Sequence, residues 1–307
     1  RKSFLEYKME KMINHYQISH VGRKRASNED FIAFKNYGEN SIFLVCDGMG
    51  GKVGGQKASE IAAKTIIHLF DNNDFSSILE SINNALSNAN NEIYNYALNN
   101  PEFSGMGTTC SIAIINKKGL FYGNIGDSRI YLCRNKQLKK LTKDDSFVQG
   151  MLDRGLINSE EAKTHPRKNE LTNALGIKKD ISINDKALFL SLFPRDKLLI
   201  CSDGLYNEVQ ENIIEQQINL TYSLKKITDS LLDIALKNGG NDNISIQLIE
   251  ISSSFKNTLT TNQPKEIQPT PTKIQGSYVV RTNTTKNYNK SNVLLLAAIL
   301  LIVLAGF

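Results

Sequence analysis

The sequence predicts an α+β fold: a layered α-β-β-α sandwich of two antiparallel sheets flanked by helices, followed by a C-terminal tether and an apolar anchor. Two observations predict the sandwich. Apolar stretches of strand length follow one another through short turns such as 116–119 and 126–128, and the two longest helical patterns, 56–70 and 76–99, come consecutively. Strands in meanders with helices outside indicate antiparallel layers, whereas strict alternation of strand and helix would indicate a doubly wound parallel sheet.

Each expected element has a local reason. Strands are predicted where short apolar runs are bounded by turn residues: 31–35, 41–46, 108–116, 119–126, 129–134, 186–192, 197–202 and 244–250. Helices are predicted where apolar residues recur at helical spacing: 56–70, 76–99, 144–154, 208–218 and 223–237. The chain has 307 residues, of which 40% are hydrophobic and 22% charged, so it is typical of a folded protein and not of a fully disordered one.

Composition divides the chain into four parts. Residues 1–15 are predicted to be an N-terminal extension, and they lack the apolar stretch of a secretory signal. Residues 16–252 are predicted to form one folded domain without internal repeats. Residues 253–292 are rich in Ser, Thr, Asn, Gln and Pro and cannot bury enough apolar surface to fold alone, so we expect a flexible linker.

Residues 293–307 read VLLLAAILLIVLAGF and are predicted to be a transmembrane segment that anchors the chain. These fifteen residues make about 22 Å of helix, whereas a helix that crosses a bilayer usually needs roughly 20 residues. The span or a following domain is therefore expected to continue past Phe307. A buried core helix is the alternative. Lys286 and Lys290 place the preceding flank on the cytoplasmic side, so the folded domain is expected in the cytoplasm, attached to the cell membrane.

Charge, cysteine and histidine usage give no indication of a nucleic-acid partner or of a zinc site with nitrogen and sulfur ligands. The net charge of +6 lies mostly in the linker, where six Lys and Arg residues accompany a single Glu266, so no nucleic-acid partner is indicated. The four cysteines lie far apart in apolar runs and are expected to be small core residues in a reducing compartment. The four histidines lack the spacing of a zinc site, so any metal is expected to be held by oxygen atoms.

Four aspartates share one setting, beside a strand and next to small or flexible residues. They are Asp47, Asp127, Asp203 and Asp242. Carboxylates at the ends of separate strands can meet at one sheet edge, where they repel one another unless cations lie between them. Any single Asp-Gly is an ordinary turn, but four matching positions predict a site for Mg²⁺ or Mn²⁺.

The glycine cluster CDGMGGKVGG around Asp47 does not fit a nucleotide-binding loop. Both GxxxxGK[ST] and GxGxxG fail because Cys46 or Val53 stands where these motifs need Gly, Ser or Thr. These glycines are expected to allow a close backbone approach to something other than a nucleotide.

Eight sequence motifs in order give residues 18–250 a specific family resemblance. The region resembles the metal-dependent serine/threonine protein phosphatases of the PPM (PP2C-like) family, in its bacterial form. The motifs are GRKRASNED (22–30), VCDGMGG (45–51), MGTTC (106–110), GNIGDSRIYL (123–132), LTKDDS (141–146), HPRKNELTNALG (165–176), CSDGL (201–205) and GGNDN (239–243).

The resemblance implies hydrolysis of phosphoserine and phosphothreonine on proteins by a water that bridges two metal ions. It implies that Asp47 bridges the ions, that the Gly48 carbonyl joins one of them, and that Asp203 and Asp242 complete the other. Asp127 with Asp203 would hold a third ion. A water between two divalent cations is acidic enough to attack phosphorus at neutral pH, so no covalent protein intermediate is needed.

The same resemblance implies supporting roles in the segment 22–30. Glu29 and Asp30 would act mostly through metal-bound waters, and Arg25 would bind the substrate phosphate. A guanidinium matches a phosphate through two parallel hydrogen bonds, which a lysine cannot make. A plain surface arginine is the other interpretation of Arg25, since Arg23 and Lys24 precede it.

Three residues depart from the family pattern. Met49 replaces the histidine that many eukaryotic relatives carry, so the leaving group must be protonated by another group. Asp145 and Asn173 stand where relatives usually have His and Arg.

Residues 146–170 correspond to the flap of bacterial members, which is either a candidate specificity element or a solvated loop. His165 within it is expected to be structural.

One alternative function from another class stays open. The chain could be a membrane-tethered pseudophosphatase that binds phosphoproteins as a scaffold, although loss of a ligand aspartate would mark such a protein and all four are present. A cysteine-dependent phosphatase is excluded because no cysteine has Arg six positions later, and a serine hydrolase because GxSxG is absent. A membrane Ser/Thr kinase is a predicted partner, since a shared bilayer raises the effective concentration.

Overall fold

The computed structural model describes residues 12–71, 75–182 and 187–258. Strand β3 (Asn40–Met49) shows how the sequence builds the layers, because its successive side chains enter different cores. Ile42 and Leu44 pack against helices, whereas Phe43 and Val45 pack between the two sheets. This period of two residues is that of a strand buried on both faces.

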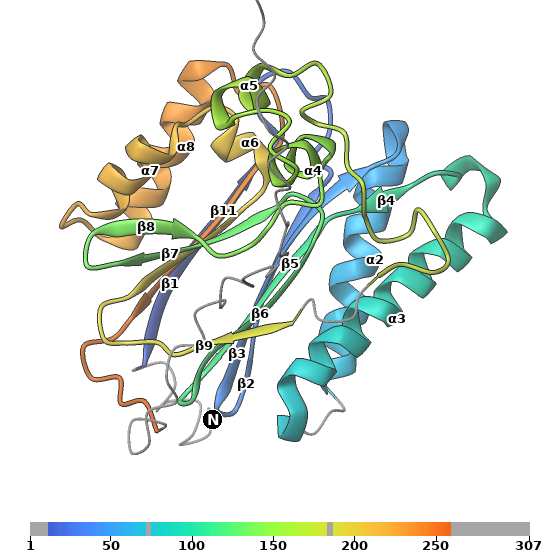
Figure 1. Cartoon of the computed structure of the whole chain (residues 1–307). Helices are drawn as coiled ribbons and strands as arrows, with labels where there is room; N and C mark the ends of the chain where they lie inside the picture. Colours follow the sequence, from blue (N-terminus) through green and yellow to red (C-terminus); the bar gives the residue numbers. More distant parts are fainter. Residues whose placement is uncertain (1–11, 72–74, 183–186, 259–307) are drawn as a thin grey trace, which may run out of the picture. The chain divides into compact units, whose positions relative to one another are not determined.

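Two antiparallel sheets lie face to face (Figure 1). The order of the first is β1 (Ile13–His20), β11 (Ile244–Ile251), β10 (Lys197–Cys201), β7 (Arg129–Arg134) and β8 (Gln137–Lys140). The order of the second is β2 (Asp30–Tyr37), β3, β5 (Cys110–Asn116), β6 (Gly119–Ile125) and β9 (Leu188–Leu190), and the short β4 (Gly107–Thr108) pairs with the end of β3.

Helices cover the outer face of each sheet. The long helices α2 (Gly51–Asp71) and α3 (Ile78–Asn99) pack on the sheet that contains β3, through a core that includes Ala58, Ile82 and Leu86. The helices α7 (Glu211–Ile218) and α8 (Leu224–Asn238) pack on the other sheet through Ile214, Leu231 and neighbouring residues. The predicted α+β sandwich of two antiparallel sheets flanked by helices is confirmed.

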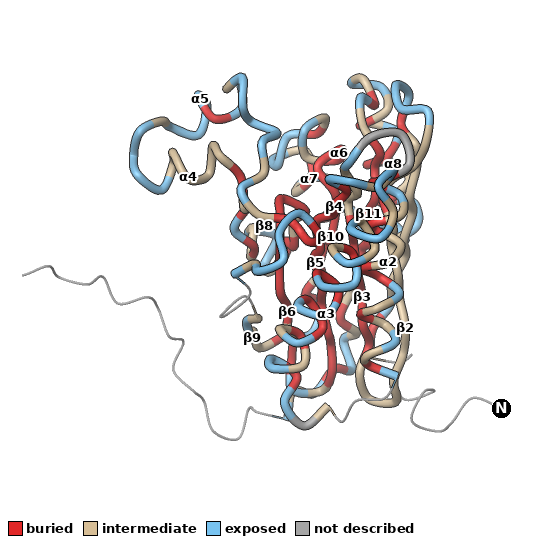
Figure 2. The backbone as a smooth tube through the Cα atoms, turned by 90° about the vertical axis from the view of Figure 1, so that its right-hand side faces the viewer, coloured by how far each residue is buried: buried red, intermediate tan, exposed pale blue. Residues whose placement is uncertain are grey.

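The flap projects from the sandwich between β8 and β9. It contains α4 (Phe147–Asp153) and α5 (Ser159–Thr164), and Figure 2 shows both standing away from the buried strands. Its two ends are joined by a bridge between Ser146 and Leu171 and by the Phe147 amide, which donates to the Glu170 carbonyl (2.8 Å). The flap is therefore a separately closed lobe at the surface.

Several element bounds differ from the prediction. The sequence prediction lacks β1, so the boundary expected at residue 16 falls inside a strand, and it also lacks α5 and β8. The segment predicted as one strand at 108–116 is divided into β4 and β5, because Thr109 leaves the ladder and binds Asp47. All four cysteines are free and buried, as predicted.

The predicted linker begins within the described part of the chain, but most of it and the whole segment 293–307 lie outside the described residues. In the part of the chain that is described, no helix combines the length and the apolar character needed to cross a membrane.

Candidate active site

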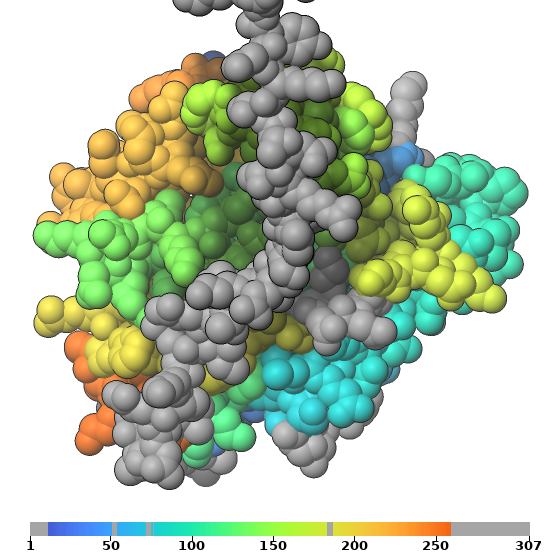
Figure 3. Space-filling view, in the orientation of Figure 1, coloured from blue at the N-terminus to red at the C-terminus, as the bar shows by residue number. Residues whose placement is uncertain are grey.

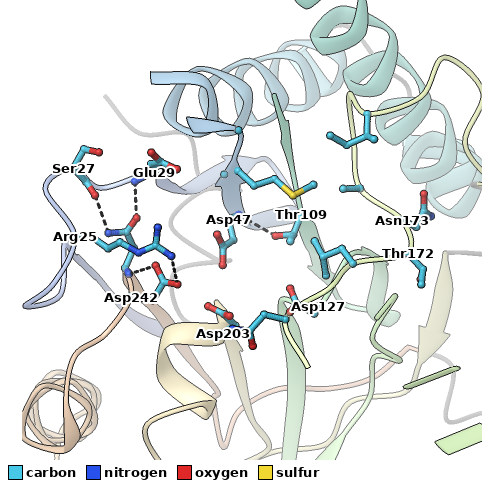
Figure 4. A pocket seen from close by; sticks show the side chains of 18 of the residues that line it. Arg25, Ser27, Glu29, Asp47, Thr109, Asp127, Thr172, Asn173, Asp203 and Asp242 are labelled. Carbon is cyan, nitrogen blue, oxygen red and sulfur yellow. Dashed lines mark hydrogen bonds and ion pairs between the residues drawn. The ribbon is translucent and has the colours of Figure 1, made fainter. Parts of the chain in front are cut away.

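The four predicted aspartates line one cleft of about 880 Å³. Figure 4 shows Asp47 in its centre, with Asp127, Asp203 and Asp242 around it. Asp47 lies near the end of β3. Asp127 follows β6, Asp203 begins the helix after β10, and Asp242 precedes β11. The predicted convergence of strand-end carboxylates is therefore present.

The backbone of Asp47 is fixed on both sides. The Thr109 amide and the Thr108 hydroxyl donate to its carbonyl oxygen (2.8 and 2.9 Å), and its own amide donates to the Thr109 hydroxyl (2.9 Å). Three hydrogen bonds from one neighbouring segment hold this residue in one position, so its carboxylate is aimed into the cleft by rigid elements and not by a loop.

Gly48 allows a close approach of three backbone segments. A Cβ atom at this position would lie 2.1 Å from the Gly55 carbonyl oxygen and 2.6 Å from that of Glu29. Only glycine fits between the start of α2 and the segment before β2. The glycine cluster thus serves close packing around Asp47, as the sequence indicates.

Asp203 and Asp30 each keep one buried oxygen without a hydrogen-bond partner. Asp203 starts α6 (Asp203–Tyr206), and Asn207 donates to its Oδ2 (3.0 Å), while its Oδ1 has no partner among the described residues. Asp30 accepts from the Ser202 hydroxyl through Oδ2 (2.7 Å), and its Oδ1 is likewise unpartnered in the described part. A buried carboxylate oxygen without a donor is costly, which is the condition that a bound cation relieves.

The backbone of Asp127 is held by a tyrosine that stacks on an ion pair of Arg129 and buried Asp144. The Tyr206 hydroxyl donates to the Asp127 carbonyl oxygen (3.0 Å), and the Arg129 guanidinium lies 3.5 Å from the centre of the Tyr206 ring. Arg129 in turn pairs with buried Asp144 (2.6 Å). These contacts fix the turn that carries Asp127.

Burial and mutual repulsion raise the carboxyl pKa values in the cleft. Burial is the main cause of the raised pKa of Asp47, and the charges of Asp30 and Asp203 add to it. Burial, followed by the charge of Asp127, also raises the pKa of Asp203 well above its ordinary value. Burial raises the pKa of Asp30 and of Asp127 to about 6. Such a set favours either protons or cations at its centre.

The carboxylates surround the cleft without closing a cage. Within the described ranges, no three acidic, histidine or cysteine side chains lie close enough to form a ready-made ion cage. Mg²⁺ and similar hard ions keep several waters and use one or two carboxylates each, so spaced oxygen ligands suit hydrated ions. The unpartnered oxygens, the raised pKa values and the all-oxygen donor set together fit divalent cations.

Arg25 lies at the rim and is paired with a predicted metal ligand. Its Nη2 donates to Asp242 Oδ2 (2.7 Å), and the two side chains are 53% and 33% exposed. This contact uses one of the five guanidinium donors, so others remain to face the cleft. The hydrogen bond with Asp242 is the main cause of the raised pKa of Arg25.

Comparisons with known proteins identify the family of this chain. The family model described as Protein phosphatase 2C matches residues 19–248. The chain belongs to the protein phosphatase 2C family. The serine/threonine phosphatase stp of Listeria welshimeri is 37% identical over 234 residues, which cover 75% of this chain and 92% of that protein. The serine/threonine protein phosphatase PstP of Mycobacterium tuberculosis is 31% identical over 230 residues, which cover 75% of this chain and 43% of that protein.

Solved structures of such phosphatases share the fold. The crystal structure of PstP/Ppp from Mycobacterium tuberculosis has a TM-score of 0.72 at 29% identity and covers 78% of this chain and 99% of that one. The PstP catalytic domain in complex with two manganese ions has a TM-score of 0.70 at 29% identity. The match covers 78% of this chain and 99% of that one. The predicted bacterial family, serine/threonine protein phosphatase activity and divalent-metal dependence are confirmed, and the pseudophosphatase scaffold is not favoured.

The three departures from the usual 2C phosphatase pattern lie in or beside the cleft. Met49 and Asn173 line it. The Asn173 amide donates to Asp145 Oδ2 (3.4 Å), and the Gly126 amide donates to the same oxygen (3.2 Å). Asp145 therefore links the far wall of the cleft to the turn before Asp127. His165 caps α5, and its Nδ1 accepts from the Arg167 amide within the flap (3.1 Å).

Asn243 binds three backbone groups of the segment 21–29, a role that the sequence motifs do not indicate. Its side chain accepts from the Glu29 amide (2.7 Å) and donates to the carbonyl oxygens of Val21 and Ser27 (both 2.9 Å). This buried amide holds the segment that carries Arg25 and Glu29 beside Asp242. Its place in the motif GGNDN is the one sequence feature that points to Asn243, but the groups it binds lie more than two hundred residues earlier in the chain.

Proposed function

We propose that this phosphatase holds its ions through Asp47, the Gly48 carbonyl, Asp127, Asp203 and Asp242. Two ions would share Asp47, and a third would lie at Asp127 and Asp203. The buried, unpartnered Oδ1 of Asp203 carries the proposal, because it lines the same cleft as the other three aspartates and a bound cation would satisfy it. The two manganese ions in the related PstP structure support the first pair, and each ion would be Mn²⁺ or Mg²⁺.

Bound ions would supply an acidified water for direct attack on phosphorus and would neutralise charge on the phosphoryl oxygens. The residues of the chain orient the reaction. Arg25 would bind the phosphate of phosphoserine or phosphothreonine from the rim, and Glu29 and Asp30 would hold ordered waters beside the ligands. Met49 has no proton to give, so the proton for the leaving alkoxide must come from elsewhere in the cleft.

Thermal unfolding at two pH values tests the ligand assignment. Asp30 and Asp127 have pKa values of about 6 in the folded chain against 3.8 ordinarily, so folding favours their protonated forms. This contribution to stability is complete below about pH 4 and is lost as the pH rises through about 6. In EDTA, the Tm is expected to fall between pH 5 and pH 7, and Mn²⁺ is expected to restore it at pH 7 by on the order of 5 °C or more.

A much smaller Mn²⁺ effect is expected at pH 5, where protons compete for the same oxygens. Scanning calorimetry of the full chain in EDTA and in Mn²⁺ measures the Tm shift at both pH values. An equal Mn²⁺ shift at the two pH values would contradict binding to this carboxylate set.

We also propose that the phosphatase domain is cytoplasmic, is tethered by residues 253–292, and is anchored to the cell membrane through residues 293–307. Its substrates would include phosphoproteins at the same membrane, among them a Ser/Thr kinase, in a role in signal transduction. The polar composition of the tether and the uncharged apolar run after Lys290 support this proposal. Vesicle flotation tests it: the full chain should float with the vesicles, and a chain ending at residue 258 should remain at the bottom. Equal recovery of both at the bottom would refute the anchor.

A further inference from the structure

The segment that follows the flap forms the wall of the cleft opposite Arg25. Figure 4 shows Thr172 and Asn173 on the far side of the aspartates from Arg25. The chain continues along this wall through Ala174, Ile177 and Lys178, which also line the cleft. None of these residues is a predicted metal ligand, and all of them line the cleft that a substrate would enter.

This wall is fixed to the body of the domain by its backbone. The amides and carbonyls of Thr108 and Leu175 exchange two hydrogen bonds (3.0 and 2.9 Å). Gly176 follows with φ +89°, and a Cβ there would lie 2.2 Å from Ile93 Cγ2. The chain thus turns sharply against α3 in a conformation that glycine adopts most easily. Figure 3 shows the yellow-green segment lying against the teal surface of α3.

Asn90 of α3 completes the attachment. Its side chain is 1% exposed and makes three hydrogen bonds with the wall. The Gly176 amide donates to its Oδ1 (2.8 Å), and its Nδ2 donates to the carbonyl oxygens of Lys178 and Lys179 (3.0 and 2.9 Å). All three wall groups belong to the backbone, so Asn90 determines where the side chains of residues 177 and 178 project.

The wall presents one apolar and one cationic side chain toward the cleft, and the apolar one, Ile177, also lies against Gly107. Ile177 is 41% exposed although it lies at the cleft, and Lys178 is exposed beside it. Among the described residues, the Lys178 ammonium has no ion-pair partner, whereas several other lysines pair with a nearby carboxylate. A rigid backbone that carries an exposed apolar group and an unpaired cation is suited to contact a bound chain.

We propose that Lys178 and Ile177 select phosphoprotein segments with an acidic side chain and an apolar side chain close to the phosphorylated residue, and that Asn90 is the positioning residue for both. The inference rests on the phosphatase function and adds a substrate class to it. A substrate rich in carboxylates meets repulsion from the four aspartates of the cleft, and Lys178 offsets this repulsion on the wall away from Arg25.

Charge reversal at Lys178 tests the selection. Three substrates are compared with the full chain in Mn²⁺: p-nitrophenyl phosphate, a phosphothreonine peptide flanked by Glu and Leu, and the same peptide with Gln in place of Glu. The wild type is expected to prefer the Glu peptide over the Gln peptide about threefold in kcat/KM. Lys178→Glu should reverse this preference and leave p-nitrophenyl phosphate hydrolysis unchanged.

Lys179→Glu is the matched control, because Lys179 is exposed on the same segment but does not line the cleft. It should keep the wild-type preference. The proposal is overturned if Lys178→Glu retains the preference, if Lys179→Glu loses it equally, or if Lys178→Glu also loses p-nitrophenyl phosphate hydrolysis. The latter substrate reports phosphatase chemistry separately from peptide selection.

Asn90→Ser tests the positioning role. The variant should lower the Tm and should also reduce the Glu preference, through a higher KM for the Glu peptide, while kcat for p-nitrophenyl phosphate is kept. A lower Tm with the peptide preference intact would assign Asn90 to stability alone and would overturn this part of the proposal.

Discussion

Asp47→Asn is expected to reduce kcat/KM for a phosphothreonine peptide by on the order of 1000-fold or more. Asn keeps the shape of Asp47 and its backbone hydrogen bonds but removes the charge that two ions would share. Initial rates of phosphate release at saturating Mn²⁺ measure the effect.

The fold of this variant should be retained. Asp47 lies among like charges, and burial and repulsion raise its pKa, so a neutral side chain removes an unfavourable charge near pH 7. The Tm in EDTA should therefore equal or exceed that of the wild type. Asp229→Asn, in the exposed part of α8, is the control and should leave the rate unchanged. Retained turnover in Asp47→Asn would remove Asp47 from the site.

Arg25→Lys is expected to lower kcat/KM for the phosphopeptide by about 10- to 100-fold, mainly through a higher KM. Lysine keeps the positive charge near Asp242 but cannot offer two parallel N–H groups to a phosphate. Inorganic phosphate should also become a weaker inhibitor, because it uses the same contact. Steady-state kinetics with and without phosphate measure both changes.

Lys24→Ala is the control for this prediction, since Lys24 is exposed next to Arg25 and does not line the cleft. It should leave KM and phosphate inhibition near the wild-type values. If Arg25→Lys behaves in the same way, Arg25 is a surface residue whose role is confined to its ion pair with Asp242.

The ligand aspartates are predictable from sequence because their position follows from local order. Asp47, Asp127, Asp203 and Asp242 each lie next to an apolar strand, and strands that pair in sheets bring their ends together. Asn90 and Asn243 are not predictable in this way. Each bonds backbone groups more than eighty residues distant, and an isolated asparagine carries no sign of such partners.

The elements that escape prediction have weak local patterns. Strand β1 contains only two aliphatic residues, Ile13 and Ile18, because it is an edge strand that pairs with β11 alone. Helix α2 starts at Gly51, five residues before its predicted start, although glycine is a poor helix former. The close contact of Gly55 with Gly48 explains why tertiary packing outweighs propensity there.

Isothermal calorimetry of the full chain with Mn²⁺ measures ion binding by these aspartates. Phosphate release from a phosphothreonine peptide is measured on the same samples. Wild-type turnover should rise with ion occupancy and disappear in EDTA, and Asp47→Asn should lose both tight binding and turnover. A third bound ion in the wild type would support the site at Asp127, and a limit of two would remove that site. Full turnover in EDTA, or unchanged Mn²⁺ binding by Asp47→Asn, would contradict the central claim that these aspartates hold the catalytic ions.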